Sequence, residues 1–158
     1  MDTSGARSRY VMRAWAIATA PSILIAIVYA SIASLFGFEP PHRIVSLSFV
    51  VRGILVAPPL ETALMIVLYF CLALVIWRGE AMRIAVMATL ASFAHVIGGS
   101  WQAAVFVFWP FCLFSTALVA WRERSFRDAF FVVTSIHALH NATSLALFAL
   151  LTVAIHAA

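Results

Sequence analysis

The sequence predicts an all-α, polytopic transmembrane helix bundle with about five spans and one short interfacial or re-entrant helix. Of its 158 residues, 65% are hydrophobic and only 10% are charged, whereas soluble domains are nearer half apolar and a quarter charged. The mean hydropathy is +1.05. Several apolar runs reach the roughly 20 residues that a helix needs to cross a bilayer. The whole chain, residues 1–158, is therefore expected to form a single integral membrane domain.

Five apolar stretches are predicted to span the membrane after a polar tail over residues 1–13. They cover residues 14–36, 58–77, 82–97, 101–121 and 129–155. The basic tail also leaves open a signal peptide cleaved near Ala30–Ser34. The first stretch is, however, longer than the roughly 7–15 apolar residues usual in signal peptides, and this favours a retained span.

Residues 44–77 form an apolar run that is too long for one span. A single helix of that length would extend about 51 Å at 1.5 Å per residue, against a hydrocarbon core of about 30 Å. Arg52 and the pair Pro58-Pro59 interrupt the run. We therefore expect an interfacial or re-entrant helix over about 44–56, followed by the second span.

The positions of the arginines predict the orientation of the chain. All ten basic residues are arginines. Five spans would place eight of them on one side of the membrane (Arg7, Arg9, Arg13, Arg78, Arg83, Arg122, Arg124, Arg127) and leave Arg43 and Arg52 for the other. The positive-inside rule then predicts a protein of the cell (inner) membrane with a cytoplasmic N-terminus and a C-terminus outside. Arginines confined to span ends indicate topology, so the lipid bilayer is the expected partner and nucleic acid is not.

One polar stretch stands out inside the last span, residues 135–144. It places His137, His140 and Asn141 at i, i+3 and i+4, which is one face of a helix. Polar side chains are costly within a membrane and usually face the bundle interior for a functional reason. Two further ionisable residues lie in apolar surroundings: Glu61, in the first turn of the second span, and His95, near the end of the third.

These side chains are of the types that peptide hydrolysis requires. A helix N-terminus stabilises the Glu61 carboxylate and burial destabilises it, and this balance suits a base near neutral pH. One histidine could orient a water, and a second histidine and an amide could stabilise the oxyanion. The same side chains could instead hold a divalent metal, so a metal-dependent membrane protease or a metal carrier is one alternative.

Three segments resemble the motifs of a known family. Residues 57–62 (Ala-Pro-Pro-Leu-Glu-Thr), 92–95 (Ser-Phe-Ala-His) and 137–141 (His-Ala-Leu-His-Asn) are similar, in order and spacing, to Glu-Glu-x-x-x-Arg, Phe-x-x-x-His and His-x-x-x-Asn. These are the motifs of the CAAX-processing and bacteriocin-processing (CPBP, or Abi) family of intramembrane glutamic proteases. The resemblance covers about residues 50–145. It implies an endopeptidase without a cofactor that cleaves a membrane-anchored protein or peptide.

The resemblance also implies a role for each motif residue. Glu61 and His95 would activate water, and His137 and Asn141 would form the oxyanion site. With the arginine-derived orientation, Glu61 would lie about one helical turn below the outer surface and His137 close to mid-bilayer. The site would then open in the outer half of the membrane, toward an exported substrate.

Thr62 and His140 are candidate accessory residues. His140 either takes part directly or hydrogen-bonds a neighbouring helix. Thr62 and Ile66 stand where the family has its second glutamate and its arginine, and Ala91 stands where it has phenylalanine. These departures give a further alternative, a catalytically silent relative that binds a membrane peptide, as in bacteriocin immunity.

Overall fold

The structure, a computed structural model, describes residues 3–36, 46–77, 79–98 and 101–157. Every regular element in these ranges is a helix, and five helical stretches are long and apolar enough to cross a membrane. The elements are α1 (Thr3–Leu35), α2 (Leu47–Val51), the π-helix η1 (Arg52–Val56), α3 (Ala57–Val75), α4 (Glu80–Gly98), α5 (Trp101–Arg122) and α6 (Phe126–Ala157). The predicted all-α bundle with five candidate spans is confirmed.

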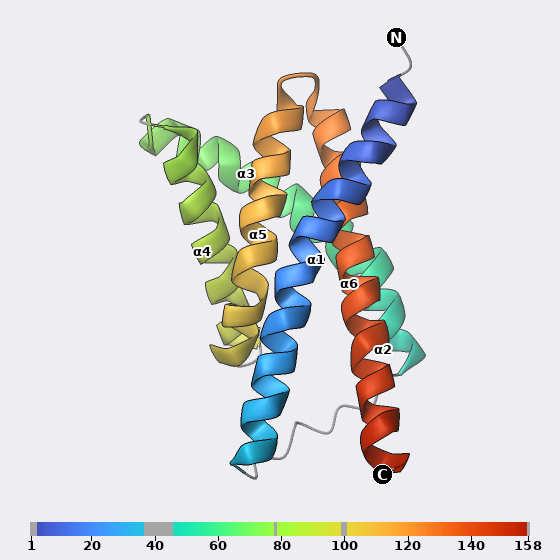
Figure 1. Cartoon of the computed structure of the whole chain (residues 1–158). Helices are drawn as coiled ribbons and strands as arrows, with labels where there is room; N and C mark the ends of the chain where they lie inside the picture. Colours follow the sequence, from blue (N-terminus) through green and yellow to red (C-terminus); the bar gives the residue numbers. More distant parts are fainter. Residues whose placement is uncertain (1–2, 37–45, 78, 99–100, 158) are drawn as a thin grey trace.

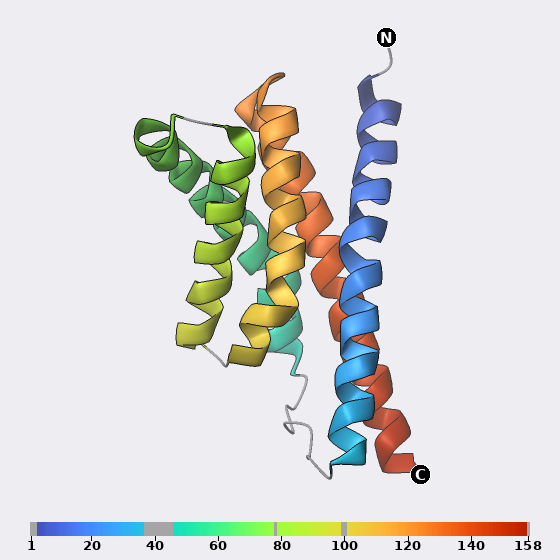
Figure 2. The same ribbon diagram turned by 60° about the vertical axis from the view of Figure 1, so that its left-hand side comes forward.

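The long helices alternate in direction (Figures 1 and 2). α1, α4 and α6 run one way, and α3 and α5 run the other. α5 packs against α4, α6 and α1, so it occupies the middle of the bundle. Its buried side chains Phe114 and Leu118 share one hydrophobic core with Met87 of α4 and Ile136 of α6. This core holds together the helices that carry the histidines.

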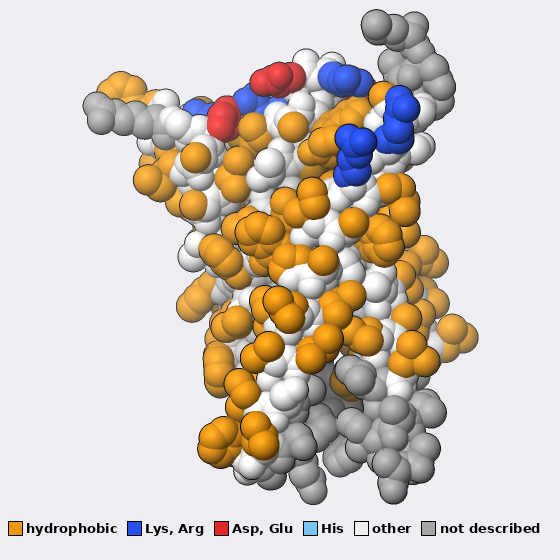
Figure 3. All heavy atoms as spheres, viewed as in Figure 1, with side chains coloured by type: hydrophobic (Ala, Val, Ile, Leu, Met, Phe, Trp, Pro, Cys, Tyr) orange, Lys and Arg blue, Asp and Glu red, His pale blue; other side chains and the backbone are white. Residues whose placement is uncertain are grey.

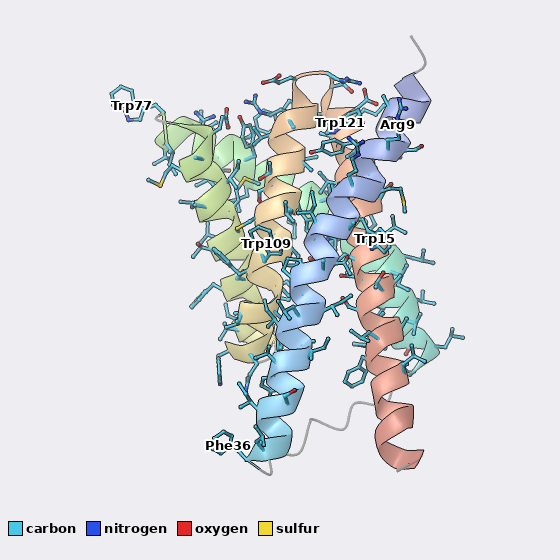
Figure 4. All side chains as sticks on the ribbon, viewed as in Figure 1. Arg9, Trp15, Phe36, Trp77, Trp109 and Trp121 are labelled. Carbon is cyan, nitrogen blue, oxygen red and sulfur yellow. The ribbon has the colours of Figure 1, made fainter. Side chains whose placement is uncertain are left out.

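α1 begins earlier than the sequence predicts. Residues 3–13, expected as a polar tail, form its first turns. Arg7 forms an ion pair with Asp128 at the start of α6. Tyr10 packs edge-on against the buried Trp121 of α5, with 5.3 Å between the ring centroids, and Figure 4 labels this tryptophan beside the upper turns of α1. These tertiary contacts explain why a polar segment with weak apolar periodicity is helical.

The interruption predicted within residues 44–77 is a change of helix type. The π-helix η1 joins α2 to α3, and the helical stretch continues from Leu47 to Val75. The expected short helix over 44–56 therefore corresponds to α2 and η1, which lead directly into α3. Residues 44 and 45 lie outside the described ranges. Glu61 follows the start of this stretch by 14 residues (61 − 47), or about 21 Å of helix. Its expected depth of one turn below the outer surface stays a prediction.

Charged side chains gather at one end of the bundle, where α1, α4 and α6 begin and α3 and α5 end (Figure 3). Glu80 there pairs with Arg83 at 3.0 Å and with Arg122, which links α4 to α5. Every described arginine except Arg52 belongs to this end of the bundle. Arg78, Arg43 and the loop over residues 39–42 lie outside the described ranges. The described chain thus carries the charge asymmetry that the arginine positions predict.

Candidate active site

Glu61 and His137 meet where α3 packs against α6. Glu61 lies near the start of α3, and His137 lies on the buried face of α6. The distance from Glu61 Oε2 to His137 Nε2 is 3.6 Å, and the two side chains are 28% and 5% exposed. This separation is slightly longer than a hydrogen bond, so the two side chains are close neighbours without a direct hydrogen bond. The expected proximity of these two residues is found.

His95 joins the pair from α4. It lies close enough to both Glu61 and His137 for a charge on its ring to act on them. The Nδ1 atom of His95 lies 2.8 Å from the carbonyl oxygen of Ala91. A carbonyl only accepts, so Nδ1 carries the proton, and in the neutral ring Nε2 keeps its lone pair. His95 is therefore oriented as a hydrogen-bond acceptor, as the activation of a water requires.

Two phenylalanines of α5 contact the histidine rings, and neither was among the predicted site residues. Phe111 lies between His95 and His137, at centroid distances of 5.5 Å and 5.7 Å. Phe114 stacks on the His137 ring at 4.5 Å. Both phenylalanines are buried. Their i, i+3 spacing could have indicated an aromatic face on α5, but its contact with the histidines depends on the packing of three helices.

Asn141 contacts the backbone of the π-helix. Its Nδ2 donates to the carbonyl oxygen of Gly53 at 2.8 Å. In η1 the backbone N–H of Ala57 donates to the carbonyl oxygen of Arg52, five residues earlier. With the same spacing, the donor to the Gly53 carbonyl would be the N–H of residue 58. That residue is Pro58, which has no N–H. The Asn141 side chain thus supplies the donor that proline removes, and it ties α6 to the segment leading to Glu61.

Several buried polar atoms at the site have no hydrogen-bond partner among the described residues. They are Glu61 Oε2, Thr62 Oγ1 and His137 Nδ1. An unsatisfied buried polar group costs about 1–3 kcal/mol, and native proteins usually satisfy such groups or use them. A water molecule or a substrate carbonyl and amide could satisfy these atoms. The arrangement therefore has the polarity of a binding site within an apolar bundle.

The two candidate accessory residues lie in different surroundings. His140 is buried and its Nδ1 lies 3.3 Å from Thr19 Oγ1 on α1. Of the two roles expected for His140, the hydrogen bond to a neighbouring helix is the one found. Thr62 is fully buried beside Glu61 in sequence, and its hydroxyl is one of the unpartnered atoms. A neutral hydroxyl thus occupies the position where the family motif has a second carboxylate.

A ready-made metal site is not found in the part of the chain that the structure describes. No group of three or more His, Cys, Asp or Glu side chains there is arranged to hold a metal ion. Structural and catalytic zinc sites use at least three protein ligands.

Comparisons with family models, with curated proteins and with solved structures gave no significant match. The resemblance to the CPBP family rests on the three motif segments alone and stays a prediction. The structure places Glu61 3.6 Å from His137, and the rings of His95 and His137 both contact Phe111. Asn141 lies on the same helix as His137, with its amide on Gly53. Their catalytic roles stay predictions.

Proposed function

We propose that the protein is an intramembrane endopeptidase of the CPBP type that hydrolyses a peptide bond of a membrane-anchored protein or peptide. The observation that carries the proposal is the contact between the half-buried Glu61 and the buried His137, 3.6 Å apart, with His95 near both. Isolated carboxylates are rare within apolar spans, and their presence usually marks a functional site. The motif resemblance supplies the reaction class.

The proposed reaction uses water as nucleophile. Glu61 takes a proton from a water that the His95 Nε2 orients, and the oxygen forms a bond to the peptide carbonyl carbon. The carbonyl oxygen becomes an oxyanion, which N–H groups of His137 and Asn141 stabilise. Collapse of the intermediate breaks the C–N bond, and Glu61 returns the proton to the leaving amine. The products are a carboxylic acid, which then releases its proton to water, and a free amine.

Asn141 has the hydrogen-bonding capacity for this role. A side-chain amide has two N–H donors, and the carbonyl of Gly53 accepts one. Because the amide group is planar, the hydrogen bond to Gly53 also fixes the direction of the second N–H of Asn141. We infer that the Gly53 carbonyl, which lacks a backbone donor because of Pro58, orients the Asn141 amide toward the oxyanion.

A catalytically silent relative that binds a membrane peptide is the second candidate. Thr62 and Ile66 favour it, because the motif positions for a second carboxylate and an arginine are uncharged here. The unpartnered atoms of the site would then accept and donate hydrogen bonds to a bound peptide without cleaving it.

We propose that the chain lies in the cell (inner) membrane with the arginine-rich end in the cytoplasm. His95 lies three residues before the end of α4 (98 − 95), on the side opposite the charged end. His137 lies eleven residues after the start of α6 (137 − 126), about 17 Å from the charged end. We propose that this site, near mid-bilayer, opens toward the outer half of the membrane and acts on exported substrates.

Cysteine labelling tests this orientation. In a background lacking Cys71 and Cys112, single cysteines would replace Ser48 and Glu123, which are exposed at opposite ends of the described chain. We expect an impermeant maleimide added to intact cells to label position 48 and not position 123. Labelling of position 123 alone would invert the orientation and place the site toward the cytoplasm.

The proposed activity is tested by comparing newly formed protein N-termini in membranes of cells that express the wild-type chain or a variant. Glu61→Gln and His95→Ala should abolish new termini near membrane anchors. Glu123→Gln makes the same chemical change at an exposed position and should leave them unchanged. If wild-type and Glu61→Gln cells give the same termini, or if the wild type gives none, the endopeptidase proposal fails and the binding alternative replaces it.

A further inference from the structure

A cavity of about 370 Å³ lies between α1 and the start of α6, away from the candidate active site. Its lining residues are Arg7, Ser125, Arg127, Asp128 and Phe131. Sites for small molecules commonly have volumes of about 300–1,000 Å³. The two helices that border it are candidate spans, beginning at Gly5 and Phe126. Under the proposed membrane orientation, the cavity lies at the boundary between one membrane surface and the apolar core.

The charges of the cavity suit a single anion. Two arginines and one aspartate give a net charge of +1 (2 − 1). Arg7 pairs with Asp128 through one terminal nitrogen, and its Nε has no partner among the described residues. Arg127 makes no ion pair within the described part of the chain, and its guanidinium lies 5.9 Å from the centre of the Phe131 ring. Arginine donors remain available for a ligand.

Ser125 adds a further donor. Its Oγ accepts a hydrogen bond from the backbone N–H of Asp128 at 2.9 Å, which caps the first turn of α6. A hydroxyl that accepts through a lone pair still has its own proton to donate. Planar guanidinium groups and hydroxyls together are typical ligands of phosphate oxygens.

We propose that this cavity binds the phosphate group of an anionic phospholipid. Phe131 is 48% exposed and lies one turn further along α6 from the arginine-bearing turn, so it would contact the beginning of an acyl chain. A soluble phosphate ion would gain nothing from this apolar side of the cavity. The phosphocholine headgroup also carries a quaternary ammonium, and this positive charge would be repelled by a site whose net charge is already positive.

Lipid binding to the purified full-length protein tests the proposal. Native mass spectrometry in a non-ionic detergent would measure the apparent Kd for phosphatidylglycerol, for phosphatidylcholine of the same chain length, and for competing inorganic phosphate. We expect phosphatidylglycerol to bind at least several-fold more tightly than phosphatidylcholine. Millimolar inorganic phosphate should displace little of it. Equal apparent Kd values for the two lipids would overturn the proposed lipid site. Displacement of phosphatidylglycerol by an equimolar concentration of inorganic phosphate would overturn it as well.

Three variants separate this cavity from a diffuse basic surface. Arg127→Gln and Arg7→Gln should each weaken phosphatidylglycerol binding about tenfold, as expected for the loss of a charge-assisted hydrogen bond. Arg124→Gln is the matched control, because Arg124 lies over the Trp121 ring and does not line the cavity. Arg127→Gln breaks no ion pair among the described residues, so it tests the site even if Arg7→Gln impairs folding. Equal losses for Arg124→Gln and Arg127→Gln would refute a specific site.

Discussion

The hydrogen bond between Asn141 and Gly53 gives a prediction about stability that depends on proline. Asn141→Ala removes the 2.8 Å bond to the Gly53 carbonyl. Side-chain hydrogen bonds in membrane proteins contribute about 0.6 kcal/mol on average and up to about 1.7. This one lies at the upper end of that range, because Pro58 cannot supply the alternative backbone donor. We therefore expect Asn141→Ala to lower the free energy of unfolding by about 1–2 kcal/mol.

A double-mutant cycle with Pro58→Ala isolates the cause. An alanine at position 58 restores an N–H, so the helix can satisfy the Gly53 carbonyl without Asn141. Asn141→Ala should then cost less than about 0.5 kcal/mol, which gives a coupling energy of about 1 kcal/mol. Unfolding by sodium dodecyl sulfate in mixed micelles, followed by circular dichroism, measures all four proteins. An equal cost of Asn141→Ala in both backgrounds would refute the proposed link between proline and asparagine.

Three further predictions concern packing and polar contacts, and the same unfolding measurement checks each. A Cβ at Gly53 would meet Leu145 Cδ1 at 3.4 Å, an ordinary van der Waals distance. Gly53→Ala should therefore change the free energy of unfolding by less than about 1 kcal/mol. Gly53→Leu should lower it by about 1–3 kcal/mol through overpacking. Thr19→Val removes the 3.3 Å contact to His140 and should cost about 0.5–1.5 kcal/mol. Glu80→Gln should cost less than about 1 kcal/mol, since its side chain is 38% exposed; a larger loss would show that the network with its two arginines is cooperative.

The fold class and the five spans could be predicted because apolar length is a local signal. The predicted spans over 82–97 and 101–121 differ from α4 and α5 by at most two residues at each end. Other features depend on partners far away in sequence. The early start of α1 depends on Arg7 meeting Asp128 and on Tyr10 meeting Trp121. These contacts leave no local pattern in residues 3–13.

The candidate site was predictable in its residue types and less so in its geometry. The i, i+4 spacing of His137 and Asn141 correctly indicates one face of α6. On that face, however, His137 reaches Glu61 of α3 whereas Asn141 reaches Gly53 of η1. The two prolines before Glu61 suggested a break in the helix. Instead, the missing N–H of Pro58 leaves the carbonyl of Gly53 without a backbone donor, and the Asn141 side chain donates to it. The helix continues through these prolines, from Leu47 to Val75, because η1 joins α2 to α3.

The central claim is that Glu61, His95 and His137 act on a peptide bond as one unit. Its most direct test is the rate of cleavage, in proteoliposomes, of a substrate identified by its new terminus. Residues that act as a unit have strongly non-additive effects on rate. We expect Glu61→Gln and His137→Ala each to reduce the rate by at least about 10²-fold, and the double variant to be little slower than Glu61→Gln alone. Undiminished cleavage by Glu61→Gln, or losses that multiply in the double variant, would contradict a shared site.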